Sequence, residues 1–285
     1  MQYGQSVGGR PLLAIRVPST RADAPRVMIC ANIHGVEFIG NRVATAALSQ
    51  VIARGLNARA EVWALPCLNP DGYARTWETD GDRPLGFMRK NAHGVDLNRN
   101  FPMPWSSRPV TVPFAGARTP ESATYRGAAP ASEPEVAHLI ALMGRIRPHA
   151  SVNLHAFMGT VIQPKVRHRT DHQIYGRLIG AIQRAQPRWR YTRLAFPLFD
   201  VFTGEQEDYQ HHVLRCWSVC LECFPIRASF RQHVQAPSVF WRFNPRSLKP
   251  WIENDVSAVF AYLNAALQEK RPPDRPGSAD HLMTW

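Results

Sequence analysis

Apolar and polar residues follow one another in blocks along this chain, and the blocks predict strands that alternate with helices. The apolar, β-branched run Val27-Met28-Ile29 lies in a strand expected over residues 26–33. A turn at Gly35 follows, and a helix is expected over residues 41–54. Strands that alternate with helices in this way imply a largely parallel sheet covered on both faces.

The remaining blocks extend this pattern to the end of the chain. Between residues 76 and 130 there is little periodicity and much Pro, Gly, Arg and Ser. A loop region of that length inside a compact domain is usually functional. Ser132 is a candidate N-cap for the next helix, because Glu135 stands where the reciprocal capping partner is expected. Further strands are expected over residues 12–17, 61–67, 150–155 and 217–224, and further helices over 172–186 and 254–269. The Pro-Asp-Gly sequence within residues 69–73 predicts a turn after the strand over 61–67.

No internal repeat or linker divides the chain, so we expect one α/β domain over residues 1–270. The tail over residues 271–285 is rich in Pro, Asp, Gly and Ser, and we expect it to be loosely held. No run approaches 18 apolar residues, so no transmembrane helix and no membrane partner are expected. The N-terminus lacks the apolar segment of a secretory signal, which predicts a cytoplasmic protein.

The net charge of +12 over 285 residues raises the question of an anionic partner. The arginines are scattered, and no basic stripe alternates with aromatic residues, so a nucleic-acid partner is not expected. We interpret the charge as a field that favours anionic substrates, although a generally basic solvated surface explains it equally well. The five cysteines form no framework spacing and are expected to be reduced and buried.

Polar side chains at strand ends supply a candidate metal site. His34 and Glu37 follow the strand over residues 26–33, at the end where open α/β sheets place their ligands. An imidazole and a carboxylate three residues apart can hold one zinc ion, and a third protein ligand leaves the fourth position open to water. His155 ends another expected strand. The alternatives are an incidental surface turn and a hydrogen-bonded core histidine.

Glu222 is a lone carboxylate in the apolar strand over residues 217–224, where burial is costly without a function or a partner. Zinc lowers the pKa of its bound water to about 7. A nearby carboxylate must then accept the proton and pass it to the leaving amine, a role that suits Glu222. The alternative is an ion pair between Glu222 and one of the many arginines.

Two segments of the long loop region offer hydrogen-bond donors to an anionic group. Arg89 and the Asn98-Arg99 pair could bind an oxyanion and a carboxylate, since a guanidinium binds carboxylates through two parallel hydrogen bonds. The alternative is a loop of surface arginines. The polar run of residues 96–100 beside apolar neighbours favours a site.

Taken together, these motifs resemble the zinc carboxypeptidases of the carboxypeptidase A family. Their order and rough spacing match from about Tyr3 to Phe224, and the segment from Gly94 to Pro102 is a specific signature of that family. The motifs that carry the resemblance are His34-Gly35-Val36-Glu37, Asn69-Pro70-Asp71-Gly72-Tyr73, Arg89-Lys90-Asn91, residues 94–102, Tyr125-Arg126-Gly127, Ser132-Glu133-Pro134-Glu135, His155 and Glu222.

The resemblance implies a fold and a set of roles. It implies a single α/β domain with a mixed, mainly parallel eight-stranded sheet and helices on both faces. It implies one zinc ion per chain, held by His34, Glu37 and His155, with Glu222 as general base and acid. It also implies that Arg89 stabilises the oxyanion, while Asn98 and Arg99 hold the free carboxylate of the substrate.

The chain departs from the family pattern at two places. No tyrosine stands over residues 198–202, where the family has a mobile tyrosine, so substrate capping is altered or comes from another residue such as Tyr209. Val36 replaces the arginine of the digestive enzymes, which argues against pancreatic-type specificity. In the region that sets side-chain preference, Glu207 would favour a basic or amino-bearing group. The alternative for Glu207 is an acidic residue at the solvated start of a helix.

We therefore predict a zinc-dependent hydrolase of a peptide or muropeptide substrate that carries a free carboxylate. The leading hypothesis resembles the cytoplasmic murein peptide amidases, which cleave the γ-D-glutamyl–diaminopimelate bond. Diaminopimelate offers a carboxylate to Arg99 and an amine to Glu207. The alternatives are a C-terminal carboxypeptidase that prefers basic residues, a deacylase of small N-acyl amino acids, and a non-catalytic basic protein that binds nucleic acid.

Overall fold

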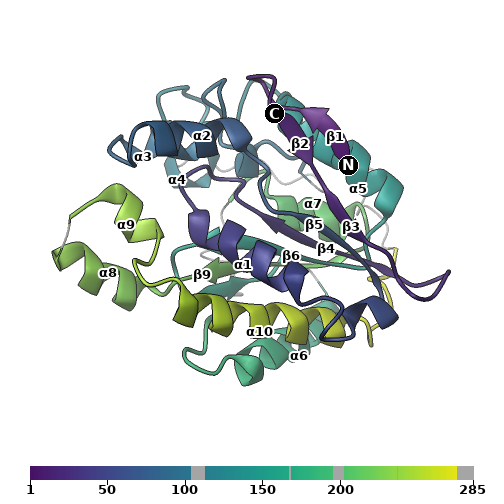
Figure 1. Ribbon diagram of the computed structural model, residues 1–285. Coiled ribbons are helices and arrows are strands. Elements are labelled where there is room, and N and C mark those ends of the chain that lie inside the picture. Colours follow the sequence, from purple (N-terminus) through teal and green to yellow (C-terminus); the bar gives the residue numbers. More distant parts are fainter. Residues whose placement is uncertain (104–112, 167, 195–201, 236, 275–285) are drawn as a thin grey trace.

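The computed structural model describes residues 1–103, 113–166, 168–194, 202–235 and 237–274 (Figure 1). Within these ranges a seven-stranded mixed sheet has helices on both faces, and a small two-stranded sheet lies beside it. The α/β class and the mainly parallel sheet are therefore confirmed. The resemblance implied eight strands in the sheet, and within the described residues the main sheet has seven.

The main sheet has the strand order β3-β5-β4-β6-β9-β7-β8. The β3–β5 and β7–β9 pairs are antiparallel, and the other pairs are parallel, so the centre of the sheet is parallel. The strands of this sheet are β3 (Ile15–Val17), β4 (Arg26–Ala31), β5 (Glu61–Leu65), β6 (Ala150–Ala156), β7 (Thr160–Ile162), β8 (Thr192–Leu194) and β9 (Trp217–Cys223), and the small sheet pairs β1 (Gln2–Gln5) with β2 (Pro11–Leu13).

Helices cover the two faces of the sheet unequally. On one face, α1, α6 and α10 pack on the sheet, and the other carries α5 and α7 (Figure 1). The helices are α1 (Phe38–Ser49), α2 (Pro70–Glu78), α3 (Leu85–Arg89), α4 (Pro113–Gly116), α5 (Pro134–Ile146), α6 (Arg169–Ala185), α7 (Gln206–His212), α8 (Ile226–Gln235), α9 (Val239–Phe243) and α10 (Lys249–Ala266), with 3₁₀ turns η1 (Leu56–Ala58) and η2 (Leu97–Arg99).

The central strands are buried on both faces because helices cover both. In β4, Val27 and Ile29 enter the hydrophobic cluster under α1, α6 and α10. Met28 and Cys30, at the alternate positions, enter the cluster under α5. Cys220 and Cys223 of β9 point to opposite faces, as expected from strand alternation: Cys223 enters the first cluster, and Cys220 faces the other side.

Three local predictions were wrong. Residues 69–73, expected as a turn, begin α2, because the Asn69 side chain accepts a hydrogen bond from the Gly72 N–H (2.9 Å) and caps that helix. The loop expected over residues 76–130 contains the end of α2 and the short elements α3, η2 and α4. Ser132 does not cap α5: the flanking residue is Glu133, whose N–H donates to Asn100 Oδ1 instead.

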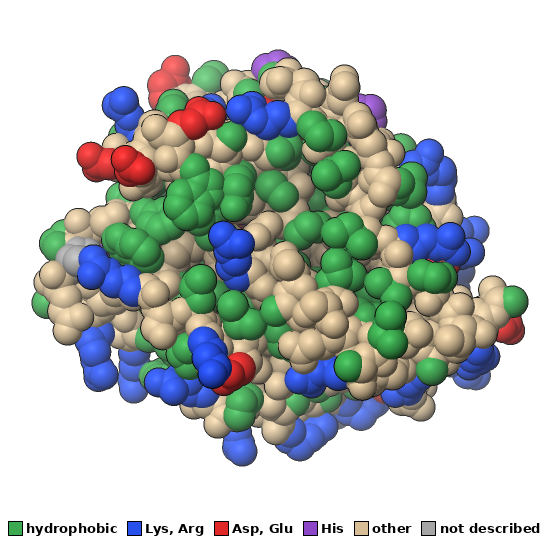
Figure 2. Space-filling view, in the orientation of Figure 1, with side chains coloured by type: hydrophobic (Ala, Val, Ile, Leu, Met, Phe, Trp, Pro, Cys, Tyr) green, Lys and Arg blue, Asp and Glu red, His purple; other side chains and the backbone are tan. Residues whose placement is uncertain are grey.

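The predictions for the surface charge and for the C-terminal tail can be compared with the structure only within the described residues. Lys and Arg side chains are spread over the face drawn in Figure 2 rather than gathered in one stripe. At the start of the tail, the Arg271 guanidinium donates to the Pro148 carbonyl (2.9 Å), while residues 275–285 of the predicted loose tail lie outside the described residues. No helix in the described ranges is long and apolar enough to cross a membrane.

Candidate metal centre

Three neighbouring parallel strands deliver polar side chains to one edge of the sheet. His34 lies just beyond β4, and His155 and Glu222 lie near the carboxyl ends of β6 and β9. The register of the parallel β6–β9 pair places His155 directly beside Glu222. Because carboxyl ends of parallel strands meet at the same edge, residues far apart in the sequence become neighbours here.

The turn between β4 and α1 is held by side chains that give it its shape. Asn32 has a φ of 58°, and its carboxamide donates to the carbonyls of His34 (2.8 Å) and Glu37 (3.4 Å). Gly35 packs against the start of α2, where a Cβ atom would lie 2.2 Å from the Gly72 carbonyl carbon. A larger residue at position 35 would push the turn away from α2, so the capped start of α2 fixes the position of the turn.

His34, Glu37 and His155 converge on one point. His34 Nδ1 lies 2.8 Å from Glu37 Oε1, and His155 Nδ1 lies 3.1 Å from Glu37 Oε2. The ligand atoms of all three residues lie within 4.8 Å of one another, and all three side chains are buried. Two imidazole nitrogens and one carboxylate are the donor set of a catalytic zinc site with an open fourth position.

The hydrogen bonding of His34 shows that this donor set fits a cation. His34 Nε2 lies 3.0 Å from Asp96 Oδ1, so its proton is best placed on Nε2, donating to that carboxylate. Nδ1 then lies 2.8 Å from an oxygen of Glu37, a contact that either a second ring proton or a bound cation must bridge. Asp96 therefore orients the imidazole as carboxylates do in zinc sites.

Charges around the turn keep its carboxylates ionised. Burial raises the pKa of Glu37, but the charges of His34 and His155 lower it by more. The net pKa of Glu37 is therefore well below its usual range. Burial likewise raises the pKa of Asp96, while Arg89 and His34 lower it to a net value far below normal. The carboxylates of Glu37 and Asp96 are thus ionised, which is the state in which carboxylates bind or support a divalent cation.

Asp96 is a residue that the sequence analysis missed. Its Oδ2 accepts a hydrogen bond from Arg89 Nε (2.9 Å), so one carboxylate positions both a candidate metal ligand and a candidate oxyanion donor. It also caps η2 by accepting from the Asn98 N–H (3.1 Å). The signal was present, because Asp96 opens the same polar run that contains Asn98 and Arg99.

Seven of the eight residues predicted for the site line one cavity of about 200 Å³. Apolar side chains, including Phe157, Ile162 and Phe243, form part of its wall. The cavity therefore combines a polar floor with apolar sides, as small-molecule sites commonly do. The seven residues are His34, Glu37, Arg89, Asn98, Arg99, His155 and Glu222.

Glu222 faces the cavity without a cationic partner. Its Oε2 is buried and has no hydrogen-bond partner, and the described residues contain no ion pair to this carboxylate. The alternative of a structural Glu–Arg pair is therefore not observed. Burial, followed by the negative charge of Glu37, raises the pKa of Glu222 to about 8, so this carboxyl group holds a proton readily.

The two arginines are fixed in the cavity wall, contrary to the alternative of a loop of surface arginines. The side chains of Arg89 and Arg99 are 13% and 6% exposed. Arg99 Nη1 donates to the Asn98 carbonyl (2.6 Å) and lies 3.7 Å from Glu205 Oε1. Asn98 is held in turn, because its Oδ1 accepts from the Gln206 N–H (2.9 Å).

Glu207 is the predicted site residue that the structure places outside this cavity. It is buried in α7, where its Oε1 accepts from Asn153 Nδ2 (2.8 Å). Together with His155 and Cys220 it forms a second group of potential metal ligands, with ligand atoms within 4.8 Å of one another. The acidic residue of α7's flank that lines the cavity is Glu205. A substrate contact of Glu207 stays a prediction.

Tyr209 does not stand in the cavity either. Its ring is buried and packs against Phe101, with 5.8 Å between the ring centroids. The cavity wall contains Phe202, whose ring lies 4.6 Å from the Arg99 Cζ atom. Residues 198–201, where the family tyrosine is missing, lie outside the described residues.

The sequence and the fold of this chain are similar to those of known proteins. A profile of the family described as zinc carboxypeptidase matches residues 1–233. Murein peptide amidase A of Escherichia coli K12 is 31% identical over 165 residues, which are 57% of this chain and 61% of the amidase. Metallocarboxypeptidase A of Trichophyton tonsurans is 27% identical over 244 residues, 74% of this chain and 55% of that protein.

The chain spans less than two thirds of these relatives' own lengths, and the match to carboxypeptidase D of Drosophila melanogaster (36% identity over 111 residues) covers only 8% of that protein. Solved structures share the fold. Carboxypeptidase A of Helicoverpa armigera has a TM-score of 0.75 at 22% identity, over 94% of this chain and 68% of that one. The murein-tripeptide amidase of Escherichia coli O157 has a TM-score of 0.52 at 21% identity, over 95% and 92%.

Proposed function

This chain belongs to the zinc carboxypeptidase family, and we propose that it is a hydrolase that cleaves a peptide or isopeptide amide next to a free carboxylate. The observation that carries this proposal is one cavity that contains a three-ligand donor set, a carboxylate without a cationic partner and a buried guanidinium. Each group has a separate task in amide hydrolysis, and all of them line the same cavity.

His34, Glu37 and His155 would hold the zinc ion, with Asp96 orienting His34 through its Nε2 proton. When bound, zinc polarises the scissile carbonyl and lowers the pKa of water in the open position. His34 and Glu37 stand on the tight turn after β4, and His155 stands near the end of the neighbouring strand β6. Their positions are therefore set by the sheet before the metal arrives.

Glu222 would move the proton that the reaction requires. It takes a proton from the attacking water and passes it to the nitrogen of the leaving amine. Its place beside His155, on the adjacent strand, keeps it next to the ligand cluster. Arg89 points into the same cavity and would donate hydrogen bonds to the carbonyl oxygen as negative charge develops there.

Arg99 and Asn98 would hold the free carboxylate of the substrate. The guanidinium is confined by the Asn98 carbonyl and by the Phe202 ring, so it is oriented before substrate binds. A carboxylate held here places the neighbouring amide over the ligand cluster, and this arrangement explains why cleavage would occur next to a free carboxylate. The nearby Glu205 carboxylate makes this end of the cavity attractive to an amino group as well.

For the substrate we propose a murein peptide, cleaved at the γ-D-glutamyl–diaminopimelate bond. The support is the 31% identity to murein peptide amidase A over 57% of this chain, together with a guanidinium and a carboxylate at one end of the cavity. Diaminopimelate carries a carboxylate and an amine that match this pair. A cytoplasmic location is part of the same proposal. A C-terminal carboxypeptidase for basic residues is the second candidate, favoured by the same Glu205 carboxylate.

Three substrates separate these functions. The purified protein is loaded with zinc and given a murein tripeptide, a peptide that ends in Lys or Arg, and an N-acetyl amino acid, each with and without chelator. Chelator-sensitive release of diaminopimelate supports the amidase. Release of Lys or Arg alone selects the carboxypeptidase, and release of acetate alone selects a deacylase. Failure to turn over any of the three, with zinc bound, overturns the hydrolase.

A further inference from the structure

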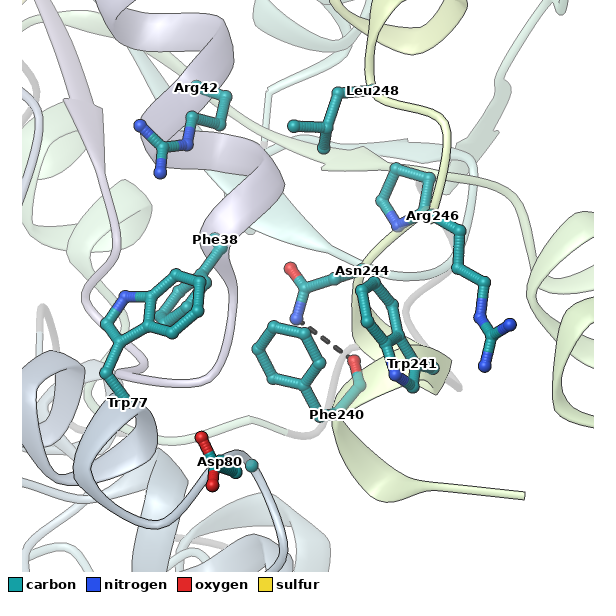
Figure 3. Close-up of a pocket in the computed structure, with 11 residues that line it drawn as sticks. Phe38, Arg42, Trp77, Asp80, Phe240, Trp241, Asn244, Arg246 and Leu248 are labelled. Carbon is teal, nitrogen blue, oxygen red and sulfur yellow. Dashed lines mark hydrogen bonds between the residues drawn. The ribbon is translucent and has the colours of Figure 1, made fainter. Parts of the chain in front are cut away.

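A second pocket lies on the other side of α9 from the cavity that contains His34, Glu37 and His155 (the metal cavity). It has a volume of about 300 Å³ and is formed by α1, the C-terminal end of α2, and α9 with the segment that follows it. Figure 3 shows Phe38 and Trp77 on one side, with Phe240 and Trp241 toward the other. Hydrophobic side chains also gather around this place on the face drawn in Figure 2, between α1, α2 and α9.

The aromatic rings of this pocket are ordered against one another. Trp77 stacks on Phe38 with 4.3 Å between the ring centroids and 30° between the planes, and Phe240 meets Phe38 edge-on at 5.2 Å. Trp77 is nevertheless 47% exposed, which is unusual for so large an apolar side chain in a stacked cluster. Part of the indole surface therefore remains available to a further ring.

Two arginines stand at the pocket, one on each side. Arg42 comes from α1, and Arg246 follows α9, where its Cζ atom lies 5.3 Å from the Trp241 ring centroid. Both side chains lie in exposed positions, and within the described part of the chain neither forms an ion pair. The single acidic residue of the lining is Asp80, so positive charge predominates.

From these features we propose that the pocket binds a small aromatic carboxylate. An aromatic ring inserted beside Trp77 and Phe240 gains the stacked and edge-on contacts that such rings prefer. A carboxylate on that ring reaches a guanidinium at the mouth, which binds it with charge-assisted hydrogen bonds. The volume lies at the lower end of the range for ligand pockets, which selects a molecule with one or two rings.

The pocket is separate from the metal cavity but shares its supports. Phe240 faces the pocket, whereas Phe243, one helical turn further along α9, lines the metal cavity. Asn244 lines the pocket and also holds the turn between β4 and α1 that carries His34 and Glu37. Its carboxamide donates to the Val36 carbonyl (2.7 Å) and accepts from the Ile39 N–H (3.1 Å). The inference does not depend on the proposed hydrolase activity, because it concerns binding alone.

Calorimetric titration with indole-3-propionate tests the proposal, and its neutral amide serves as the matched ligand control. Because Arg99 offers a carboxylate site in the metal cavity, the titration is repeated in an Arg99→Ala variant. We expect binding to persist in Arg99→Ala, and the amide to bind at least about tenfold more weakly than the acid. Loss of binding in Arg99→Ala, or equal binding of acid and amide, overturns the proposal.

The arginines are tested together and against a control. A double variant, Arg42→Ala with Arg246→Ala, is expected to lower the affinity by about tenfold or more, whereas Arg145→Ala on α5 removes an exposed arginine far from the pocket and leaves it unchanged. Thermal melting of each variant shows whether it is folded. In spectra of the wild type, the indole N–H signals of Trp77 and Trp241, assigned through Trp→Phe variants, should shift on binding. Unchanged affinity in the double variant, or unshifted signals, contradicts the proposed site.

Discussion

The two pockets on either side of α9 are lined by different kinds of side chain, although α9 contributes residues to both. The metal cavity has a floor of imidazoles and carboxylates that stand on strand ends and on the β4–α1 turn. The second pocket is walled by aromatic rings from α1, α2 and α9, with arginines only at its mouth. Its side chains stand on helices and on the loop after α9, away from the edge of the sheet that carries the metal donors.

The two pockets also differ in how firmly their polar side chains are held. In the metal cavity, hydrogen bonds fix the groups around the proposed ligands: Asp96 orients both His34 and Arg89, and Asn32 holds the turn. Such preorganised groups act on charge that develops in a reaction. In the second pocket, ring stacking and exposed charges offer area and attraction but fix no reacting geometry, which suits binding alone.

The largest expected effect comes from the proton carrier of the metal cavity. Glu222→Gln keeps the shape of the side chain but cannot accept a proton, so turnover should fall about 10²- to 10⁴-fold. Zinc content, measured on the purified variant, should stay unchanged because Glu222 is not a proposed ligand. Full activity in Glu222→Gln would show that another group accepts the proton. Binding of indole-3-propionate should not change.

The next effect concerns the proposed carboxylate anchor. Arg99→Ala removes a charge-assisted contact, so KM should rise about 10- to 100-fold with a smaller change in kcat. Arg99→Lys is the matched control, since it keeps the charge but loses the paired hydrogen bonds, and it should give an intermediate KM. Steady-state kinetics over a range of substrate concentrations measures both constants. A fall in kcat alone would place Arg99 in the chemical step instead.

A buried carboxylate outside both pockets shows what the counterions of the metal cavity achieve. Asp255 accepts hydrogen bonds from Tyr191 (3.0 Å) and Asn254 (3.0 Å), but the described residues provide it with no ion pair. Burial outweighs these hydrogen bonds and raises its pKa from 3.8 to about 6. In Glu37 and Asp96, by contrast, neighbouring positive charges reverse the effect of burial.

The sign of the Asp255 shift gives a stability prediction. A raised pKa in the folded state favours folding below pH 4, and this contribution is lost as the pH rises through about 6. The free energy of unfolding of Asp255→Asn, relative to wild type, should therefore rise by up to about 3 kcal/mol between pH 4 and pH 7. Urea unfolding at several pH values measures this difference. A difference that is independent of pH would show that Asp255 titrates normally.

A smaller effect is expected where the two pockets meet. Asn244→Ala removes the hydrogen bonds to Val36 and Ile39, so unfolding should become easier by about 1–3 kcal/mol and zinc should bind more weakly. Asn244→Asp retains the acceptor for the Ile39 N–H but places a buried carboxylate oxygen against the Val36 carbonyl oxygen, so it should destabilise the protein at least as much as Asn244→Ala. Thermal melting and zinc titration check both variants. Unchanged zinc affinity in Asn244→Ala would mean that the turn does not need this support.

The smallest effect is an expected absence of change. Removal of zinc by a chelator should lower the melting temperature, because a ligand that binds only the folded state stabilises it. The affinity for indole-3-propionate should remain within about twofold, because its proposed pocket contains none of the metal ligands. Calorimetry with and without chelator makes the comparison. A large loss of affinity after chelation would place the aromatic ligand in the metal cavity.

The sequence predicted the strand-end chemistry better than it predicted the helix starts. His34 and His155 were singled out because each follows or ends an apolar run, and Glu222 because it interrupts one; sheet topology brings the ends of these strands together. Asn69 was misread because a side chain that accepts from a nearby N–H serves a turn and a helix N-cap equally well. Ser132 was misread because a distant residue, Asn100, accepts the hydrogen bond from the Glu133 N–H.

The second pocket could not be predicted from the sequence. Phe38, Trp77 and Phe240 belong to three separate helices, and no spacing or motif links them. Each of them alone is an ordinary apolar residue of an amphipathic stretch. Only the packing of α9 near α1 and α2 brings the rings together, and that packing depends on long-range contacts such as those of Asn244.

The central claim, that His34, Glu37 and His155 form the zinc site of a hydrolase, is tested most directly by anomalous diffraction from crystals at the zinc absorption edge. The account predicts one zinc peak per chain, within bonding distance of the two Nδ1 atoms and of the Glu37 carboxylate, with Glu222 nearby but not bound. A peak between His155, Glu207 and Cys220, or no peak at either group in protein that was given zinc, would contradict it.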